Sequence, residues 1–282
     1  MNERKKSNER RSRWLKKSNR NNIFFISDKK QITASFAKSN FERKNSKEEL
    51  VLYLLRSYIR FYCTASGKVC STLNAITEGC GSPTKGNSRE SNDKFREALI
   101  WLQEQGFIIC DKDIHTIKNS EYFEIQILNH NLFYCGDTSF VSISMHEFET
   151  IVNSQTTTKK NILLATYLCI KKNIYNNVDM YLPSLSVPSN EIIKRVLGVS
   201  SVTTVGTAIA NLKELGLLYC DETMYYYKDL KTNVYKPTRN AYALTSSDLQ
   251  YTKEVLKDFY QVDKIYTINE IDNDKIFYPK RK

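Results

Sequence analysis

Apolar residues recur at spacings of three and four along two stretches of the first half of the chain, residues 48–62 and 92–105. This spacing is typical of amphipathic helices that bury one face. Gly106 follows the second stretch, where a helix C-cap is expected. An apolar segment at 69–76 lies between the two and completes a set of three helices. After them, short strands separated by turn residues are predicted at 107–110, 115–117 and 122–128.

The second half of the chain repeats this order. Helical spacing predicts a first helix at 157–172, a short second helix at 190–197 and a third helix at 201–215. Residues 198–200, Gly-Val-Ser, predict a tight turn, because glycine suits the end of one helix and serine suits the N-cap of the next. Strands are then predicted at 217–220, 224–228 and 240–244.

The two halves also match residue by residue at a constant offset of about 110 positions. The match covers some twenty residues without a gap. It pairs Ala98 with Ala208, Leu102 with Leu212, Gly106 with Gly216, Cys110 with Cys220 and Asp111 with Asp221. Because the element order agrees as well, the sequence predicts a duplicated module.

Three helices with a tight turn between the second and third, followed by a β-hairpin, predict a winged helix-turn-helix. Three segments of the second half, 181–185 (YLPSL), 192–200 (IIKRVLGVS) and 212–218 (LKELGLL), resemble the winged-helix domain of replication initiators from plasmids, phages and integrative elements of Gram-positive bacteria. The related DnaD-like N-terminal domain is similar. The resemblance spans residues 140–244 and implies DNA binding; the first half matches only through the repeat, and no DnaD-like C-terminal helical domain is visible.

We therefore predict a helix-rich α+β protein with two tandem winged helix-turn-helix modules. The expected boundaries are a disordered basic arm at 1–47, a first module at 48–130, a second module at 131–245 and a short helical tail at 246–282. A helix predicted at 248–260 has an apolar face that can pack on the body of the protein or on a second copy.

The positive charge of the chain is concentrated at its N-terminus. The chain has 42 Lys and Arg against 31 Asp and Glu, a net charge of +11. Residues 1–47 hold 15 basic and 4 acidic side chains, which leaves 27 of each sign in the remainder. Such an arm is expected to neutralise nucleic-acid phosphates and add salt-dependent affinity. A solubilising tail and a contact with an anionic membrane are the alternatives.

The third helix of the second module is expected to meet base edges in the major groove, and the first module and the arm are expected to add phosphate contacts. A solvated helix surface is the alternative for each residue. The predicted DNA-binding residues are Arg10, Arg11, Arg13, Lys16 and Lys17 in the arm; Lys85, Arg89, Asn92 and Lys94 in the first module; Ser201, Thr203, Thr204, Thr207 and Asn211 on the third helix of the second; and Lys228, Lys231, Lys236 and Arg239 on its hairpin. The run Tyr225-Tyr226-Tyr227 suits base stacking or, more simply, strand packing.

Several classes of function lack their signatures. Seven cysteines contain no C-x-x-C pair, and the three histidines are not neighbours, so we expect no metal site and no metal-dependent nicking activity. There is no G-x-x-x-x-G-K-[ST] motif, so an ATPase is not expected either. No apolar run reaches the roughly 18 residues of a membrane span, and no signal-peptide core follows the basic start. We expect a cytoplasmic protein with no cofactor and no membrane contact.

The sequence thus predicts a non-enzymatic protein that binds specific sites in double-stranded DNA. The favoured role is to initiate or control replication of a plasmid, phage or other mobile element by binding repeated or palindromic sites, as a homodimer and with host replication proteins as candidate partners. Two alternatives stay open. One is a winged-helix transcriptional regulator of a mobile element, and the other is a winged-helix module that binds protein.

Overall fold

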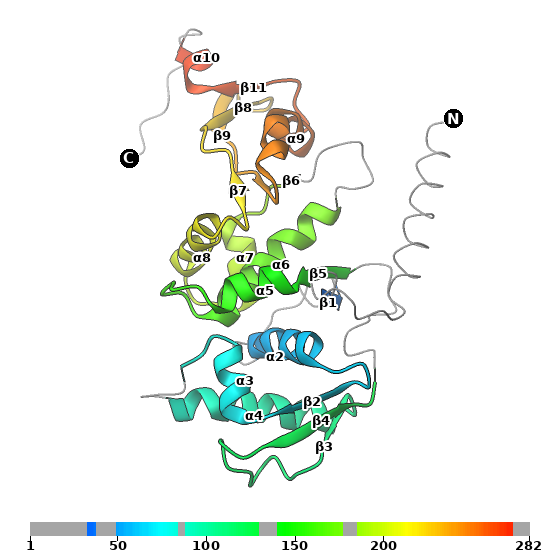
Figure 1. Ribbon diagram of the computed structural model, residues 1–282. Coiled ribbons are helices and arrows are strands. Elements are labelled where there is room, and N and C mark those ends of the chain that lie inside the picture. The colour runs from blue at the N-terminus through cyan, green and yellow to red at the C-terminus, as the bar shows by residue number, and fades with distance from the viewer. Residues whose placement is uncertain (1–32, 38–48, 84–87, 130–139, 177–184, 273–282) are drawn as a thin grey trace, which may run out of the picture.

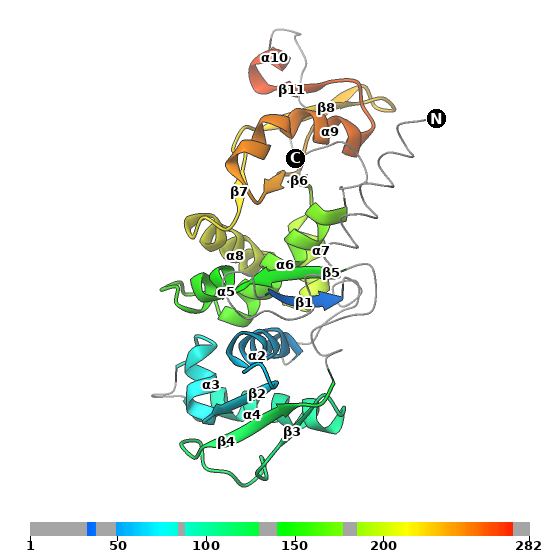
Figure 2. The same ribbon diagram turned by 45° about the vertical axis from the view of Figure 1, so that its right-hand side comes forward.

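The computed structural model describes residues 33–37, 49–83, 88–129, 140–176 and 185–272 (Figure 1). Within these ranges the chain mixes helices with small antiparallel sheets, as expected for the α+β class. Two units of similar construction and a set of C-terminal elements follow one another along the length of the molecule (Figures 1 and 2).

The first unit is a three-helix bundle with a three-stranded sheet. The residues predicted to form the apolar face of its first helix, Leu50, Leu54, Tyr58 and Phe61, are buried, and Leu55 and Ile59 are buried beside them. The Thr72 hydroxyl caps its second helix by accepting a hydrogen bond from the Ala75 N–H at 3.0 Å. The strand order is β2-β4-β3. The elements are α2 (Glu49–Tyr62), β2 (Lys68–Ser71), α3 (Leu73–Gly79), α4 (Ser88–Glu104), β3 (Ile108–Cys110) and β4 (Phe123–Ile127).

The second unit has the same construction. A helix, a strand, two helices and two strands form a bundle and a sheet of order β6-β10-β7, which corresponds to β2-β4-β3. Gly198, in the left-handed conformation at φ 64°, ends one helix, and the next begins at Val202 with an angle of 104° between their axes. The elements are α6 (Lys160–Asn176), β6 (Leu185–Ser186), α7 (Asn190–Leu197), α8 (Val202–Glu214), β7 (Tyr219–Cys220) and β10 (Tyr242–Ala243).

Residues paired by the offset of 110 occupy the same places in the two units. Gly106 and Gly216 both adopt a positive φ, at 69° and 68°. The N–H of the next residue then bonds back to the helix over 3.0 Å in each case, from Phe107 to the Leu102 carbonyl and from Leu217 to the Leu212 carbonyl. The ends of α4 and α8 are therefore built alike.

A strand inside the predicted arm overturns the expectation that residues 1–47 are all flexible. Strand β1 (Thr33–Ala37) pairs antiparallel with β5 (Phe140–Ser144), from Thr33 opposite Ser144 to Ala37 opposite Phe140. Phe36 is fully buried and packs edge-on against the Tyr53 ring, at 5.2 Å between centroids. The pattern missed β1 because a lone strand with a distant partner has no local periodic signal.

The two units share one hydrophobic core. Helix α2 packs against α6, and α5 (Met145–Val152) adds Phe148, whose ring lies 5.3 Å from that of Phe61. Beside this contact Glu147 forms a buried ion pair with Lys171 at 2.6 Å. Burial alone would raise the pKa of Glu147, but the Lys171 ammonium and the Ser144 N–H outweigh it and hold the pKa below its usual value.

The C-terminal elements form a second, smaller core instead of a purely helical tail. Strand β11 (Ile265–Thr267) pairs with β8 of a hairpin that is inserted between β7 and β10, giving a sheet of order β11-β8-β9. Val255, Leu256 and Ile265 cover the outer face of the second unit's sheet. The helix of the tail therefore packs on its own module. The remaining elements are β8 (Tyr225–Asp229), β9 (Val234–Pro237), η5 (Ser246–Tyr251), α9 (Thr252–Tyr260) and α10 (Ile268–Asp272).

The strand predicted at 115–117 is a turn. The Asp113 carboxylate accepts hydrogen bonds from the His115 N–H at 3.0 Å and the Thr116 hydroxyl at 3.1 Å. Such local side-chain bonds fix a turn at the expense of a strand.

Candidate nucleic-acid interface

Helix α8 presents a smooth, uncharged face to solvent. Its core side consists of Val205, Ala208, Ile209 and Leu212. On the other side Thr203, Thr207 and Ala210 are exposed, with half-buried Gly206 between them. The helix carries no acidic side chain before Glu214, in its last turn. This face can approach an anionic surface without charge repulsion.

Gly206 is not required by packing within the chain. A Cβ built on this residue meets no atom within 4 Å. Glycine inside a helix lowers stability by about 1 kcal/mol relative to alanine. A residue that weakens the helix and fills no tight space within the protein is suited to close approach by a ligand.

The polar side chains predicted to contact DNA from α8 differ in their exposure and in the hydrogen bonds that they already make within the protein. Thr203 and Thr207 are exposed, while Ser201 and Thr204 are half-buried. The Ser201 hydroxyl already accepts a hydrogen bond from the Thr203 N–H at 3.1 Å as the N-cap of the helix. The Thr207 hydroxyl donates to the Thr203 carbonyl at 3.0 Å, and its methyl group and both oxygen lone pairs stay available.

Asn211 points toward the start of α6 and not freely into solvent. Its amide donates to the Thr158 hydroxyl at 2.8 Å. The next residue along the chain is Lys159, which is exposed and was not among the predicted contacts. A cation therefore lies close to the C-terminal half of α8, where it can meet a phosphate.

A shallow hollow of about 220 Å³ lies beside α8. Lys213, at its edge, forms an ion pair with Glu222 at 2.7 Å. The hollow joins the exposed face of α8 to the start of α7 and to strand β10. Its polar and small lining residues include Asn190, Gly206, Ala210, Lys213, Asn240 and Tyr242.

The corresponding face of α4 has the opposite character. At the positions of Thr203 and Thr207, 110 residues earlier, stand Asp93 and Glu97, and both are exposed. Glu104 is also exposed near the end of the helix. An acidic face repels phosphates, so the two third helices differ in what they can bind.

Asn92 is not a surface residue, which corrects its prediction as a DNA contact. Its side chain is 2 % exposed. It accepts a hydrogen bond from the Thr77 hydroxyl at 2.7 Å and donates to the Asn74 side chain at 2.9 Å. Asn92 thus joins α3 to α4, and its bonding groups are used inside the protein.

The remaining residues of the first module that were predicted to contact DNA lie in different settings. Lys94 is half-buried on α4. Arg89 lies in the first turn of α4, and Lys85 lies outside the described residues. Arg96 is held by the loop before β4: it donates to the carbonyls of Ile114 and Ile117.

The β8–β9 hairpin holds the predicted basic residues in different settings. Lys236 forms an ion pair with Asp229, and its hydrogen bond lowers the pKa of that carboxyl to about 2. Lys228 lies over the Tyr235 ring at 5.8 Å, and Arg239 lies over Phe259 at 5.5 Å. Lys231, within the turn between β8 and β9, is exposed. The hairpin is stabilised internally and leaves Lys231 and Arg239 accessible.

The tyrosine run on β8 packs inside the protein, which confirms the simpler interpretation. Tyr226 is buried. The Tyr225 hydroxyl donates to Asp221 at 2.7 Å, and Tyr227 stacks on Tyr260 with ring centroids 4.2 Å apart.

The five arm residues, Arg10, Arg11, Arg13, Lys16 and Lys17, lie outside the described residues. Sequence reasoning missed Gly206, Ala210 and Lys159. The contrast between the two third helices is visible in the sequence at the offset of 110, where the exposed positions of α4 form a more mixed set that includes Asp93 and Glu97.

No group of three or more His, Cys, Asp or Glu side chains suited to hold a metal ion occurs in the part of the chain that the structure describes. Over the same ranges, no single helix has both the length and the apolar character needed to cross a membrane. No protein family model matches the chain, and no curated protein matches its sequence.

Proposed function

We propose that the chain is a sequence-specific duplex-DNA-binding protein with two tandem winged-helix modules, and that it initiates or controls replication of a plasmid, phage or other mobile element. The observation that carries the proposal is the exposed face of α8. This face is free of acidic groups up to Glu214. The axis of α8 makes an angle of 104° with that of α7, the preceding helix. Two helices at about 90–120° with the second in the major groove are the usual arrangement of a helix-turn-helix.

The proposed contacts follow from the chemistry of each side chain. Thr203 and Thr207 offer hydroxyls to base edges and methyl groups to thymine. Gly206 and Ala210 leave room for the DNA surface. Lys159 lies at one end of the face and meets phosphate oxygens. The basic N-terminal segment adds affinity that depends on salt and not on sequence.

Base reading belongs to the second module in this proposal. The exposed Asp93 and Glu97 of α4 would face phosphates if that helix entered a groove. At the usual contact distances this repulsion opposes binding. We therefore no longer expect α4 to supply the phosphate contacts that were predicted for the first module.

The test exchanges the two helix faces. A genome-fragment selection with the full chain first yields the preferred site. The double variant Thr203→Asp, Thr207→Glu gives α8 the residues of α4, and we expect it to weaken binding to that site by at least about tenfold. The matched variant Asp93→Thr, Glu97→Thr changes α4 in reverse and should leave site preference unaltered. Equal affinity of the first variant and the wild type would overturn the assignment of α8.

The positions of the selected sites distinguish the roles. Direct repeats beside the protein's own gene support a replication initiator, and operators inside promoters support a transcriptional regulator instead. Absence of any enriched site, together with affinity that does not depend on salt, would favour a module that binds protein.

A further inference from the structure

The outer face of the first unit's sheet is exposed and combines apolar side chains with polar ones that are already paired. Residues directly opposite each other in an antiparallel sheet point to the same side. The register therefore places Cys70 beside Glu124 and Ile109 beside Gln126 on this face, with Leu128 two residues further along. Ile109 is 49 % and Leu128 56 % exposed, and Cys70 is exposed too. We call this surface, which also includes Lys68, the outer sheet face.

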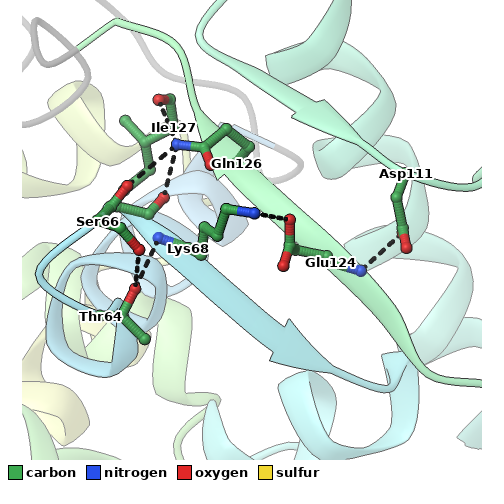
Figure 3. Close-up of polar contacts among 8 residues, drawn as sticks. Thr64, Ser66, Lys68, Asp111, Glu124, Gln126 and Ile127 are labelled. Atoms are coloured by element: carbon green, nitrogen blue, oxygen red, sulfur yellow. Dashed lines mark hydrogen bonds and ion pairs between the residues drawn. The ribbon is translucent and has the colours of Figure 1, made fainter.

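The polar groups of the outer sheet face bond to each other and to nearby backbone, as Figure 3 shows. The Lys68 ammonium lies 2.7 Å from the Glu124 carboxylate. The Gln126 amide donates to the carbonyls of Ser66 and Ile127, each at 3.2 Å. Charges and amides that are already paired lose less on desolvation than free ones. The face can therefore be covered at a modest cost.

The second unit shows what happens to the same face in the duplicated module. There Leu185, Ala243 and Tyr219 pack against the C-terminal core formed by α9 and β11. Tyr219 is the counterpart of Ile109 at the offset of 110. In the first unit no element among the described residues covers this face. One copy of the module thus buries its outer sheet face within the chain, and the other leaves it open.

We propose that the outer sheet face of the first unit is a homodimer interface, covered by the same face of a second copy. A twofold interface requires a surface that is complementary to itself. This face meets that requirement, because its one basic group, Lys68, is balanced by Glu124 and its apolar residues, Ile109 and Leu128, lie together. Two such sheets pack face to face at about 10 Å. Trp101, 43 % exposed with its ring 6.3 Å from Phe107, widens the apolar area.

Other occupants fit less well. A nucleic acid would need unpaired basic groups, and Lys68 is paired. A strongly charged peptide would find no net charge to bind. The proposal does not depend on DNA binding, so its test uses the protein alone.

Sedimentation velocity of the full chain over a concentration series to tens of micromolar measures the dimer directly. We expect a reversible dimer, and we expect Ile109→Lys and Leu128→Lys each to raise its dissociation constant at least about tenfold, because each buries an unpaired ammonium. Met224→Lys is the matched control, since Met224 is 65 % exposed, directly precedes β8 and lies off this face. Circular dichroism checks that each variant folds.

A second readout needs no destabilising change. In the proposed dimer, Cys70 of one chain lies near Cys70 of the other. A short bismaleimide should therefore cross-link the two chains through these thiols, and Cys70→Ser should abolish the cross-link. A monomer at all concentrations, or a dimer that both lysine variants leave intact, would overturn the proposal. So would a dimer whose Cys70 thiols cannot be linked.

Discussion

Gly206→Ala should make the protein more stable and a weaker DNA binder. Gly206 lies inside α8 (Val202–Glu214), where alanine is favoured over glycine by about 1 kcal/mol. The added Cβ meets no atom of the chain within 4 Å, so no clash reduces this gain. For a protein of this size, 1 kcal/mol corresponds to a rise in Tm of about 2–4 °C.

The same methyl group faces the DNA if α8 reads bases. It projects beside Thr203 and Ala210, at the edge of the exposed face that borders the hollow. A methyl inserted into a closely packed contact costs about 1–3 kcal/mol, because neighbouring groups must shift. This corresponds to an affinity loss of roughly fivefold to a hundredfold. Stability and affinity are thus predicted to change in opposite directions.

Thermal unfolding followed by circular dichroism gives the stability, and fluorescence anisotropy with the selected site gives the affinity. The control is Gly216→Ala, at the end of the same helix. Gly216 has φ 68°, where an alanine is strained, so this variant should lose about 1 kcal/mol of stability. An unchanged affinity of Gly206→Ala beside a raised Tm would refute the contact between α8 and DNA. A lowered Tm would refute the open surroundings of Gly206.

Other parts of the molecule give four further predictions. Deleting residues 1–32 should flatten the plot of log affinity against log salt by about 0.9 for each phosphate that this segment neutralises, and an unchanged slope would show that the segment does not meet DNA. Asn92→Ala should lower the free energy of unfolding by about 1–3 kcal/mol in denaturant titrations without changing DNA affinity, because its partners inside the protein are left unsatisfied. Lys171→Met should lower the free energy of unfolding by about 3–5 kcal/mol at neutral pH, because it leaves the buried Glu147 carboxylate without its ion-pair partner. Because the folded pKa of Glu147 lies below its usual 4.5, the stability from this pair is complete above that pH and lost on acidification, so wild type and variant should converge in acid unfolding curves. A chain that ends at Thr245 should unfold at a lower temperature and aggregate on size-exclusion chromatography, since it lacks the core that covers the second sheet.

Local signals in the sequence were sufficient where neighbouring residues determine the structure. Helix α7 spans the residues predicted for it, because Ser189 caps its start and Gly198 ends it in the left-handed conformation. The third helices were also found from their apolar spacing, although α4 begins four residues before its prediction. Their starts are harder to place, since polar first turns carry no periodic signal.

Features that depend on contacts between residues far apart in the sequence could not be predicted from local patterns. A polar side chain near the start of a helix is normally exposed, and the hydrogen bonds to Thr77 and Asn74 of α3 make burial of Asn92 favourable. The strand at 265–267 is too short to stand out, and its role comes from pairing with β8. In the candidate site, Gly206 carries no side chain whose chemistry could mark it in the sequence. It stands out only because the space around its missing Cβ is empty.

The ladder between β1 and β5 sets an order of events during synthesis. Strand β1 leaves the ribosome before the first unit, but its partner β5 follows only after that whole unit has been made, roughly 100 residues later. At translation rates of about 5–20 residues per second, β1 waits several seconds for the strand that it pairs with. Phe36 can meet Tyr53 on α2 well before then. The growing chain should therefore hold β1 against the nascent first unit through Phe36 and complete the β1–β5 ladder only after β5 has emerged.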